Sequence, residues 1–427
     1  PETNFRLFLS SCSSRTIHTN MRKKVAIIGG GASGFFAAIE LAILRPDLQI
    51  DIYEKSQQVL SKVKVSGGGR CNVTHACFDP KELVSYYPRG KKELRGPFSK
   101  FGPGDTISWF EQRDVELKTE IDGRMFPVTD SSQTIVNTFL DEAERLKIRI
   151  HLQKGLTGLS QKSDEWQLQF SDNTEVTVAA VLIATGSSSM IWELLSGLGL
   201  EIIPPVPSLF TFHVRDKKLQ ALSGLSVEFI NAAIVDSSIE TEGPILITHW
   251  GFSGPAILKL SAWGARILKE KDYKFSLLLD FLPGIKEERL LDDLKEYRKT
   301  ESRKKINTFS PFHEIPKRLW NYLTERTGIH DEMNWADLSN TQIQALVQQL
   351  KNGGYEVSGK STFKDEFVTC GGVALTEIDF KTYGSQRING LYFGGEVIDV
   401  DAVTGGFNFQ HAWTSGHLAA KGIAGYL

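Results

Sequence analysis

The stretch KVAIIGGGASGFFAAIELAILRPDLQIDIYEK, residues 24–55, decides the fold. It contains a continuous apolar run at 24–28, a segment of helical spacing that stops before Pro46, and a second apolar run at 49–53. A strand, a helix and a strand within about thirty residues form a βαβ unit. We therefore predict an α/β fold that begins with this unit.

Three glycines between the first strand and the helix follow the GxGxxG pattern, and Glu54 ends the second strand. In a dinucleotide site, Gly29 makes the tight turn, Gly31 admits a pyrophosphate against the backbone, and Gly34 lets helix and strand pack closely. Glu54 would accept hydrogen bonds from ribose hydroxyls and repel a 2′-phosphate, which favours FAD or NAD over NADP. The alternative is a glycine turn in a sheet that binds nothing.

Two distant segments distinguish FAD from NAD. TVAAVLIATGSSS, residues 177–189, is an apolar run that ends in Ala-Thr-Gly, and residues 388–427 give a strand, a loop with carboxylates and a helix. This layout is typical of an FAD domain that the chain leaves and re-enters. Glu396 and Asp399 would accept from ribityl hydroxyls, and the backbone of 405–408 would face the flavin's pyrimidine edge. A solvated loop is the alternative for both carboxylates.

SGGGRCN, residues 66–72, places three consecutive glycines before Arg70. Glycines cost backbone entropy on folding, so the run indicates positive φ angles or a ligand against bare backbone. The Arg70 guanidinium could pair with a cofactor phosphate or a substrate carboxylate. His249 and Ser253, in THWGFSGP, could orient a substrate or relay a proton. A turn and a helix start are the alternative for that segment.

A family resemblance rests on six motifs taken in order: GGGASG, SGGGRCNVT, ATG, THWGFSGPAIL, TCGGV and GGEVIDVDAVTGGFNFQHAWTSG. From about residue 24 to the C-terminus the chain resembles the BaiN-like family of FAD-dependent oxidoreductases, which is related to fumarate reductase and glutathione reductase type flavoproteins. The resemblance implies a two-part Rossmann-like FAD domain, interrupted by an inserted β-rich, barrel-like domain and a small helical domain. It also implies that the segment with SGGGRCN wraps a noncovalent FAD.

These patterns predict the following domain boundaries: leader or additional residues at 1–20, the first part of the FAD domain at 21–204, the β-rich domain at 205–284, the helical subdomain at 285–361, and the second part of the FAD domain at 362–427. The predicted catalytic residues are Arg70, His249 and Ser253. The predicted cofactor-binding residues are Gly29, Gly31, Ala32, Ser33, Gly34, Glu54, Lys55, Ser66, Gly67, Gly68, Gly69, Arg70, Cys71, Asn72, Leu156, Ala184, Thr185, Gly186, Gly395, Glu396, Asp399, Gly405, Gly406, Phe407 and Asn408.

Two patterns that are absent from the sequence narrow the possible electron donors and reaction types. No second GxGxxG follows the ATG strand, so NADH or NADPH would dock without a Rossmann fingerprint of its own, or electrons would come from an organic substrate. Five residues separate Cys71 from Cys77, which is not the usual spacing of a flavin-coupled disulfide. We favour hydride transfer through flavin N5 for the reduction of a small unsaturated carbonyl compound. An oxygen-dependent amine oxidase, a flavin protein that modifies nucleic acid and a redox sensor are alternatives.

Composition narrows partners and location. The net charge of −2, with no long basic block, predicts a small-molecule substrate and no nucleic acid. No apolar stretch reaches the roughly 18 residues of a spanning helix, so no membrane is expected. Four scattered cysteines predict no metal site and a cytoplasmic location. The oligomeric state stays open.

Overall fold

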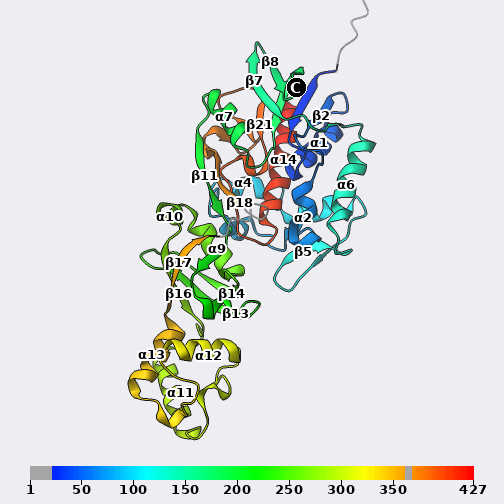
Figure 1. Ribbon diagram of the computed structural model, residues 1–427. Helices are drawn as coiled ribbons and strands as arrows, with labels where there is room; N and C mark the ends of the chain where they lie inside the picture. Colours follow the sequence, from blue (N-terminus) through cyan, green and yellow to red (C-terminus); the bar gives the residue numbers. More distant parts are fainter. Residues whose placement is uncertain (1–21, 361–367) are drawn as a thin grey trace, which may run out of the picture.

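The computed structural model describes residues 22–360 and 368–427. Figure 1 shows three successive parts: an α/β part with β1 and the C-terminus, a β-rich part, and a helical part farthest from the first. This arrangement confirms the predicted fold class. The leader expected at 1–20 and the junction expected at 362 lie outside the described residues.

The central sheet has seven strands in the order β19-β20-β21-β10-β1-β2-β6. The strands are β1 (Lys24–Ile28), β2 (Gln49–Tyr53), β6 (Arg149–His151), β10 (Ala180–Ile183), β19 (Ile378–Asp379), β20 (Gly384–Ser385) and β21 (Leu391–Phe393). β21 pairs in parallel with β10, so the returning chain extends the sheet that the first half began. Residues 180–183 of β10 are buried on both faces, as their apolar run predicts.

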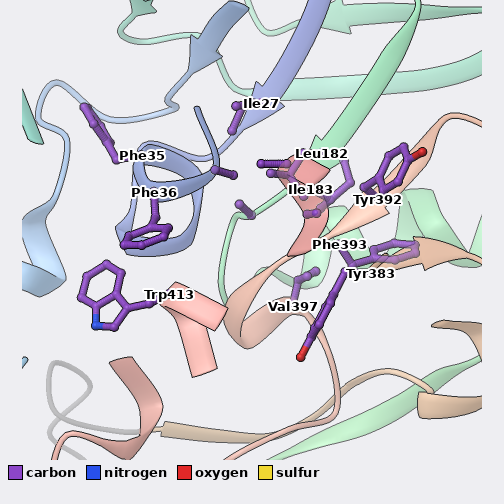
Figure 2. Close-up of a cluster of buried hydrophobic side chains, with 14 of the residues drawn as sticks. Ile27, Phe35, Phe36, Leu182, Ile183, Tyr383, Tyr392, Phe393, Val397 and Trp413 are labelled. Carbon is purple, nitrogen blue, oxygen red and sulfur yellow. The ribbon is translucent and has the colours of Figure 1, made fainter. Parts of the chain in front are cut away.

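Helices pack on this sheet, and α1 (Ala32–Leu44) lies beside α14 (Phe407–Tyr426). Gly416 allows the close approach, because a side-chain carbon there would lie 2.8 Å from the Ser33 carbonyl oxygen. Figure 2 shows Phe36 of α1 facing Trp413 of α14, with ring centroids 5.6 Å apart. The other helices of this part are α2 (Ser61–Gly69), α3 (Pro80–Leu83), η1 (Val84–Tyr86), α4 (Arg95–Phe98), α5 (Pro103–Glu111), α6 (Ser132–Arg145), α7 (Ser189–Gly197), η4 (Leu375–Glu377) and η5 (Gly395–Val397).

Three small sheets flank the central one, in the orders β3-β5-β4, β7-β8-β9 and β11-β18. Their strands are β3 (Thr74–His75), β4 (Leu117–Thr119), β5 (Arg124–Pro127), β7 (Leu156–Lys162), β8 (Glu165–Phe170), β9 (Glu175–Val178), β11 (Ile202–Ser208) and β18 (Val368–Val373). The antiparallel pair β11 and β18 consists of the strand that leaves the α/β part and the strand that re-enters it. The outgoing and returning chains are therefore joined by main-chain hydrogen bonds.

The β-rich part is a closed barrel in the order β12-β15-β14-β13-β16-β17. Its elements are β12 (Phe212–Val214), α8 (Lys217–Gln220), β13 (Ser226–Ile234), β14 (Glu240–Thr248), β15 (Gly251–Ser253), α9 (Pro255–Trp263), α10 (Ala265–Glu270), β16 (Phe275–Asp280) and β17 (Gly353–Lys360). β17 falls inside the range 285–361 that we predicted to be helical. It pairs with β12 and β16, because its alternating Tyr355 and Val357 side chains are buried in the barrel. The helical part is thus inserted before the last barrel strand.

The helical part consists of α11 (Glu287–Thr300), η2 (Ile306–Thr308), α12 (Lys317–Arg326), η3 (Trp335–Asp337) and α13 (Asn340–Lys351). Trp320 and Trp335 are fully buried and stack with ring centroids 6.3 Å apart. Its apolar residues share one continuous core with those of the barrel, whereas the α/β part has a core of its own. The remaining predicted boundaries stay predictions.

A hydrogen bond from a buried ion pair of the α/β part reaches α9 of the barrel part. The Arg89 guanidinium contacts the Asp401 carboxylate and also donates to the carbonyl of Ala262, at the end of α9, at 2.6 Å. Asp401 is fully buried and also accepts from the Ser208 hydroxyl at 2.8 Å. Because a buried charge without a partner is costly, this cluster fixes the loop before α14 against α9.

We expect Gly416→Val to destabilise the chain by about 1 to 3 kcal/mol, since the new side chain overlaps the backbone of α1. Thermal unfolding followed by circular dichroism measures the effect. Gly425→Ala is the control on the same helix, because a side-chain carbon there meets nothing within 4 Å. Equal melting temperatures for the two variants would contradict the packing described for α1 and α14.

His411 gives a pH-dependent prediction. It is buried on α14, its Nε2 has no hydrogen-bond partner, and burial lowers its pKa from 6.5 to about 3. Between these values the unfolded chain binds a proton that the folded chain does not, so stability falls as pH drops below 6.5. The loss is about 1.4 kcal/mol per pH unit.

The variant His411→Leu should lose less stability than the parent chain between neutral pH and about pH 5, by about 2 kcal/mol. Urea unfolding at each pH measures the difference. His313→Leu, at an exposed histidine of the helical part, is the matched control and should follow the parent curve. Parallel curves for His411→Leu and the parent would refute the assignment of this slope to His411.

Candidate cofactor site

The turn between β1 and α1 has the geometry that its glycines predict. Gly29 has a φ of 113°, and a side-chain carbon on it would lie 2.4 Å from the Ala184 carbonyl oxygen at the end of β10. A side-chain carbon at Gly34 would lie 2.1 Å from the Gly29 carbonyl oxygen. At Gly31, by contrast, nothing lies within 4 Å. Gly29 and Gly34 therefore allow close packing, whereas Gly31 leaves open space at the N-terminus of α1.

That N-terminus can hold an anion. No side chain caps α1 at Gly31, and its first turn contains no acidic residue. Free backbone N–H groups and the helix dipole make such an end favourable for a phosphate. Ser33 is buried and faces Ser415 of α14, with the two hydroxyl oxygens 3.4 Å apart. Ala32 and Ser33 thus form a first turn that the returning helix supports from behind.

Glu54 is fixed beside this turn. One carboxylate oxygen accepts from the Gly30 N–H at 2.8 Å, and the other accepts from the Ser56 N–H at 2.9 Å and hydroxyl at 2.8 Å. A carboxylate has about four acceptor positions, so an acceptor position remains for a ribose hydroxyl. Lys55 is exposed, and Leu156 is buried at the start of β7. The ribose-binding role predicted for Glu54 stays a prediction that this geometry permits.

The SGGGRCN segment is a left-handed turn. Gly67, Gly68 and Gly69 have φ angles of 57°, 68° and 85°, and Cys71 follows with 61°. A side-chain carbon at Gly68 or Gly69 would have no atom within 4 Å, and the glycines are exposed. Ser66 departs from helical geometry with a ψ of 152°, which ends the regular part of α2. The predicted positive φ angles are confirmed, and the backbone is accessible, but the ligand predicted to lie against it stays a prediction.

The returning chain meets these segments at two places. At the first, a side-chain carbon on Gly186 would lie 3.6 Å from the Glu396 carboxylate, which pairs with Lys62 of α2 at 2.8 Å. Thr185 precedes Gly186 at the end of β10, and the N–H of Gly395 donates to the Ser415 hydroxyl at 2.9 Å. Residues 184–186 and 395–396 therefore lie together at the carboxyl end of the sheet, where such folds bind cofactors.

At the second place, the turn before α14 packs on the segment after the glycine run. The Asn72 side-chain oxygen accepts from the Gly406 N–H at 2.9 Å, and its amide nitrogen donates to the Thr74 carbonyl at 3.0 Å. Gly405 and Gly406 have φ angles of 133° and 91°. Asn408 closes the preceding loop, with hydrogen bonds to the N–H and carbonyl of Ala402 at 3.0 and 3.1 Å.

An aromatic stack adjoins this turn. Phe407 lies parallel to Tyr86 and His75, with ring centroids 4.3 and 4.6 Å away. The Tyr87 hydroxyl donates to the Phe407 carbonyl at 2.6 Å. The first residue of α14 is therefore held both by ring stacking and by a hydrogen bond to its backbone. Sequence patterns did not reveal that Tyr86 and His75 stack on Phe407, because this contact is set by tertiary packing.

The catalytic candidates already have protein partners. Arg70 pairs with Glu120 at 2.6 Å, and its guanidinium lies over the Phe126 ring at 4.0 Å from the centroid. His249 lies on the exposed turn between β14 and β15 and contacts the Ser223 hydroxyl at 2.9 Å, while Ser253 pairs within the barrel. The catalytic roles predicted for Arg70, His249 and Ser253 stay predictions.

The structure also shows the surroundings of Asp399 and of the cysteines Cys71 and Cys77. Asp399 is only 11% exposed at its side chain and pairs with Arg266 of α10 at 3.3 Å, although burial raises its pKa. It therefore has a partner in the barrel part, and its predicted ribityl contact stays a prediction. Burial raises the pKa of Cys71 to about 12 and that of Cys77 to about 11. Both are protonated at neutral pH, which disfavours a reactive thiol pair.

The combined site fits FAD. The uncapped N-terminus of α1 suits the pyrophosphate. The carboxylate of Glu54 suits the ribose, and that of Glu396 suits the ribityl chain. The exposed glycine backbone suits the isoalloxazine ring. These features come from segments on both sides of the inserted barrel. Among residues 22–360 and 368–427 no cluster of candidate metal ligands occurs, and no helix there could span a bilayer.

Residues 23–422 match the family described as "HI0933-like protein Rossmann domain". The chain belongs to this family. The match covers nearly all described residues and confirms the resemblance found from the motifs. The chain is an FAD-dependent oxidoreductase of this type.

Three curated relatives align over almost their whole length, and two of them, from Haemophilus influenzae and Escherichia coli, share a name. The "Ribosomal RNA dihydrouridine synthase" of Haemophilus influenzae is 28% identical, over 93% of this chain and 98% of the relative. The "3-dehydro-bile acid delta(4,6)-reductase" of Clostridium scindens is 27% identical, over 94% and 99% respectively. The solved 3-ketosteroid-delta4-(5alpha)-dehydrogenase of Rhodococcus jostii RHA1 is similar in fold, with a TM-score of 0.50 and 12% identity, over 96% of this chain and 99% of that one.

Gly31→Ala should weaken FAD binding at least about tenfold, because the added carbon occupies the space left for the pyrophosphate. The FAD-free chain should keep its stability to within about 1 kcal/mol. Gly34→Ala is the matched comparison: its carbon overlaps the Gly29 carbonyl, so the FAD-free chain itself should be destabilised. Fluorescence titration with FAD and thermal melts separate the two effects. Unchanged FAD affinity in Gly31→Ala would contradict this placement of the pyrophosphate.

Proposed function

We propose that this protein reduces a carbon–carbon double bond that is conjugated with a carbonyl group, using FAD and a nicotinamide reductant, NADH or NADPH. One observation carries the proposal: the names of three full-length relatives describe saturation of this kind of bond. Dihydrouridine differs from uridine by saturation of a ring double bond conjugated with a carbonyl. The bile acid relative is named for reducing double bonds in a compound with an oxidised ring position.

The balance of the proposed reaction is simple. NADH or NADPH gives up a hydride, the β-carbon of the conjugated system receives a hydride, and the α-carbon receives a proton from solvent or a side chain. Bound FAD supplies the hydride transfer between the two, at flavin N5. No GxGxxG pattern follows β10, so the nicotinamide would dock without a Rossmann fingerprint of its own.

Residues of this chain would bind FAD and hold it in a defined orientation. The N-terminus of α1 would hold the pyrophosphate, and Glu54 would hold a ribose. The N-terminus of α14 carries no side-chain cap and no acid in its first turn, so its dipole would stabilise negative charge on the flavin's pyrimidine edge. The buried cluster of Arg89 and Asp401 would keep that helix end in position.

Two substrate classes fit the reaction. The first is a small conjugated ketone, which agrees with the net charge and with the Clostridium scindens relative. The second is a uridine within RNA, which the Haemophilus influenzae relative favours. Neither relative is named an oxidase, so the amine oxidase alternative has weaker support. A cytoplasmic location stays a proposal.

Anaerobic mixing of the yellow protein with NADH or NADPH should bleach the flavin absorbance. A conjugated steroid ketone should then restore the colour faster than its saturated analogue, because only the conjugated compound accepts a hydride at its β-carbon. Stopped-flow absorbance measures both steps. Bleaching by an amine and not by either nicotinamide, with recolouring by oxygen alone, would refute the reductase in favour of an oxidase.

A further inference from the structure

A surface hollow of about 560 Å³ lies between α3 and α4. Its lining includes Lys81 on α3, Lys92 before α4 and Arg95 on α4, together with Asp79 and Ser99. Residues of α3, of α4 and of the segment that leads into α4 line the same hollow, and together they contribute three cationic side chains. No sequence motif marks the hollow, although the segment 86–96 contains four basic residues.

The hollow has three cationic side chains and one carboxylate, and its cations form no ion pairs within the described residues. By contrast, Arg70 and Arg89 nearby are both paired with carboxylates. The one lining carboxylate, Asp79, accepts from the Lys81 backbone N–H at 2.9 Å and begins α3. Unpaired cations that share a concave surface suit a ligand with several negative charges.

The hollow is built on elements that pack against the first residue of α14. Phe98 of α4 packs against Tyr87, with ring centroids 5.2 Å apart, and the Tyr87 hydroxyl donates to Phe407 at 2.6 Å. η1 continues directly from α3 and places Tyr86 on the Phe407 ring. The backbone of α3 and α4 is therefore linked to the start of α14 through Tyr86 and Tyr87.

Cations and accessible rings together favour a nucleic acid. Tyr86 and His75, which stack on Phe407, are partly exposed. Single-stranded RNA is bound by basic grooves that follow its phosphates and by aromatic rings that contact its bases. A small conjugated ketone offers no phosphate to such a hollow. An acidic protein would use the cations but has no need of the adjoining rings.

We propose that the hollow of Lys81, Lys92 and Arg95 binds phosphates of an RNA strand whose uridine enters the neighbouring cofactor site. This inference rests on the second substrate class of the proposed function, uridine within RNA. It reverses the expectation from net charge, because a local cluster of unpaired cations binds phosphates whatever the overall charge.

The test is fluorescence anisotropy of a labelled oligouridylate of about 12 nucleotides with the full, FAD-loaded chain over a salt series. The triple variant Lys81→Ala, Lys92→Ala and Arg95→Ala should bind at least about tenfold more weakly. Its slope of log affinity against log salt should be smaller by about 2, since each lost phosphate contact removes about 0.7.

The matched control removes three exposed cations elsewhere, Arg149, Lys162 and Lys421, and should leave RNA affinity near that of the parent. Flavin absorbance and melting temperature establish that both triple variants are folded and loaded. No measurable RNA binding by the parent, equal losses in both triple variants, or equal competition by polyglutamate would overturn the inference.

Failure of the inference and failure of the proposed function are distinguishable. Reduction of the steroid ketone by the parent chain, without RNA binding, would sustain the function and refute the hollow's role. Salt-dependent RNA binding that the first triple variant loses, in a chain that no nicotinamide bleaches, would sustain the hollow's role and refute the reductase.

Discussion

The contact between Gly34 and the carbonyl of Gly29 constrains the whole molecule. It brings the N-terminus of α1 against the end of β1, and Gly29 in turn lies against Ala184 at the end of β10. Any side chain at these positions would separate helix from sheet. With α1 fixed, its uncapped N-terminus lies at the carboxyl edge of the parallel strands, where a phosphate can be stabilised by backbone N–H groups.

The second half of the chain completes what the first half begins. β21 extends the sheet beside β10, and α14 lies against α1 because Gly416 admits close contact. Asn72 joins the glycine run to the turn before α14. The cofactor site therefore exists only when segments far apart in sequence have come together. The inserted barrel contacts the same loop, because Arg89, which pairs with Asp401, also donates to the Ala262 carbonyl of α9.

Local patterns predicted the parts of the site that depend on local backbone geometry. The φ angle of Gly29, the close approach at Gly34 and the open space at Gly31 match the pattern, whereas the pyrophosphate contact at Gly31 stays a prediction. Contacts set by long-range packing could not be predicted. Sequence does not show that Arg266 pairs with Asp399, or that Tyr86 and His75 stack on Phe407. β17 was missed for the same reason, because its pairing partners precede the helical insertion.

The central claim is that both halves of the chain together bind FAD as an extended dinucleotide. The most direct measurement is calorimetric titration of the deflavinated full chain with FAD and, separately, with FMN, which lacks the adenosine half. The account predicts stoichiometric binding of FAD and binding of FMN weaker by at least about a hundredfold, because Glu54 then has no ribose partner and the α1 turn has one phosphate in place of a pyrophosphate. Equal affinities, or no binding of either flavin, would contradict it.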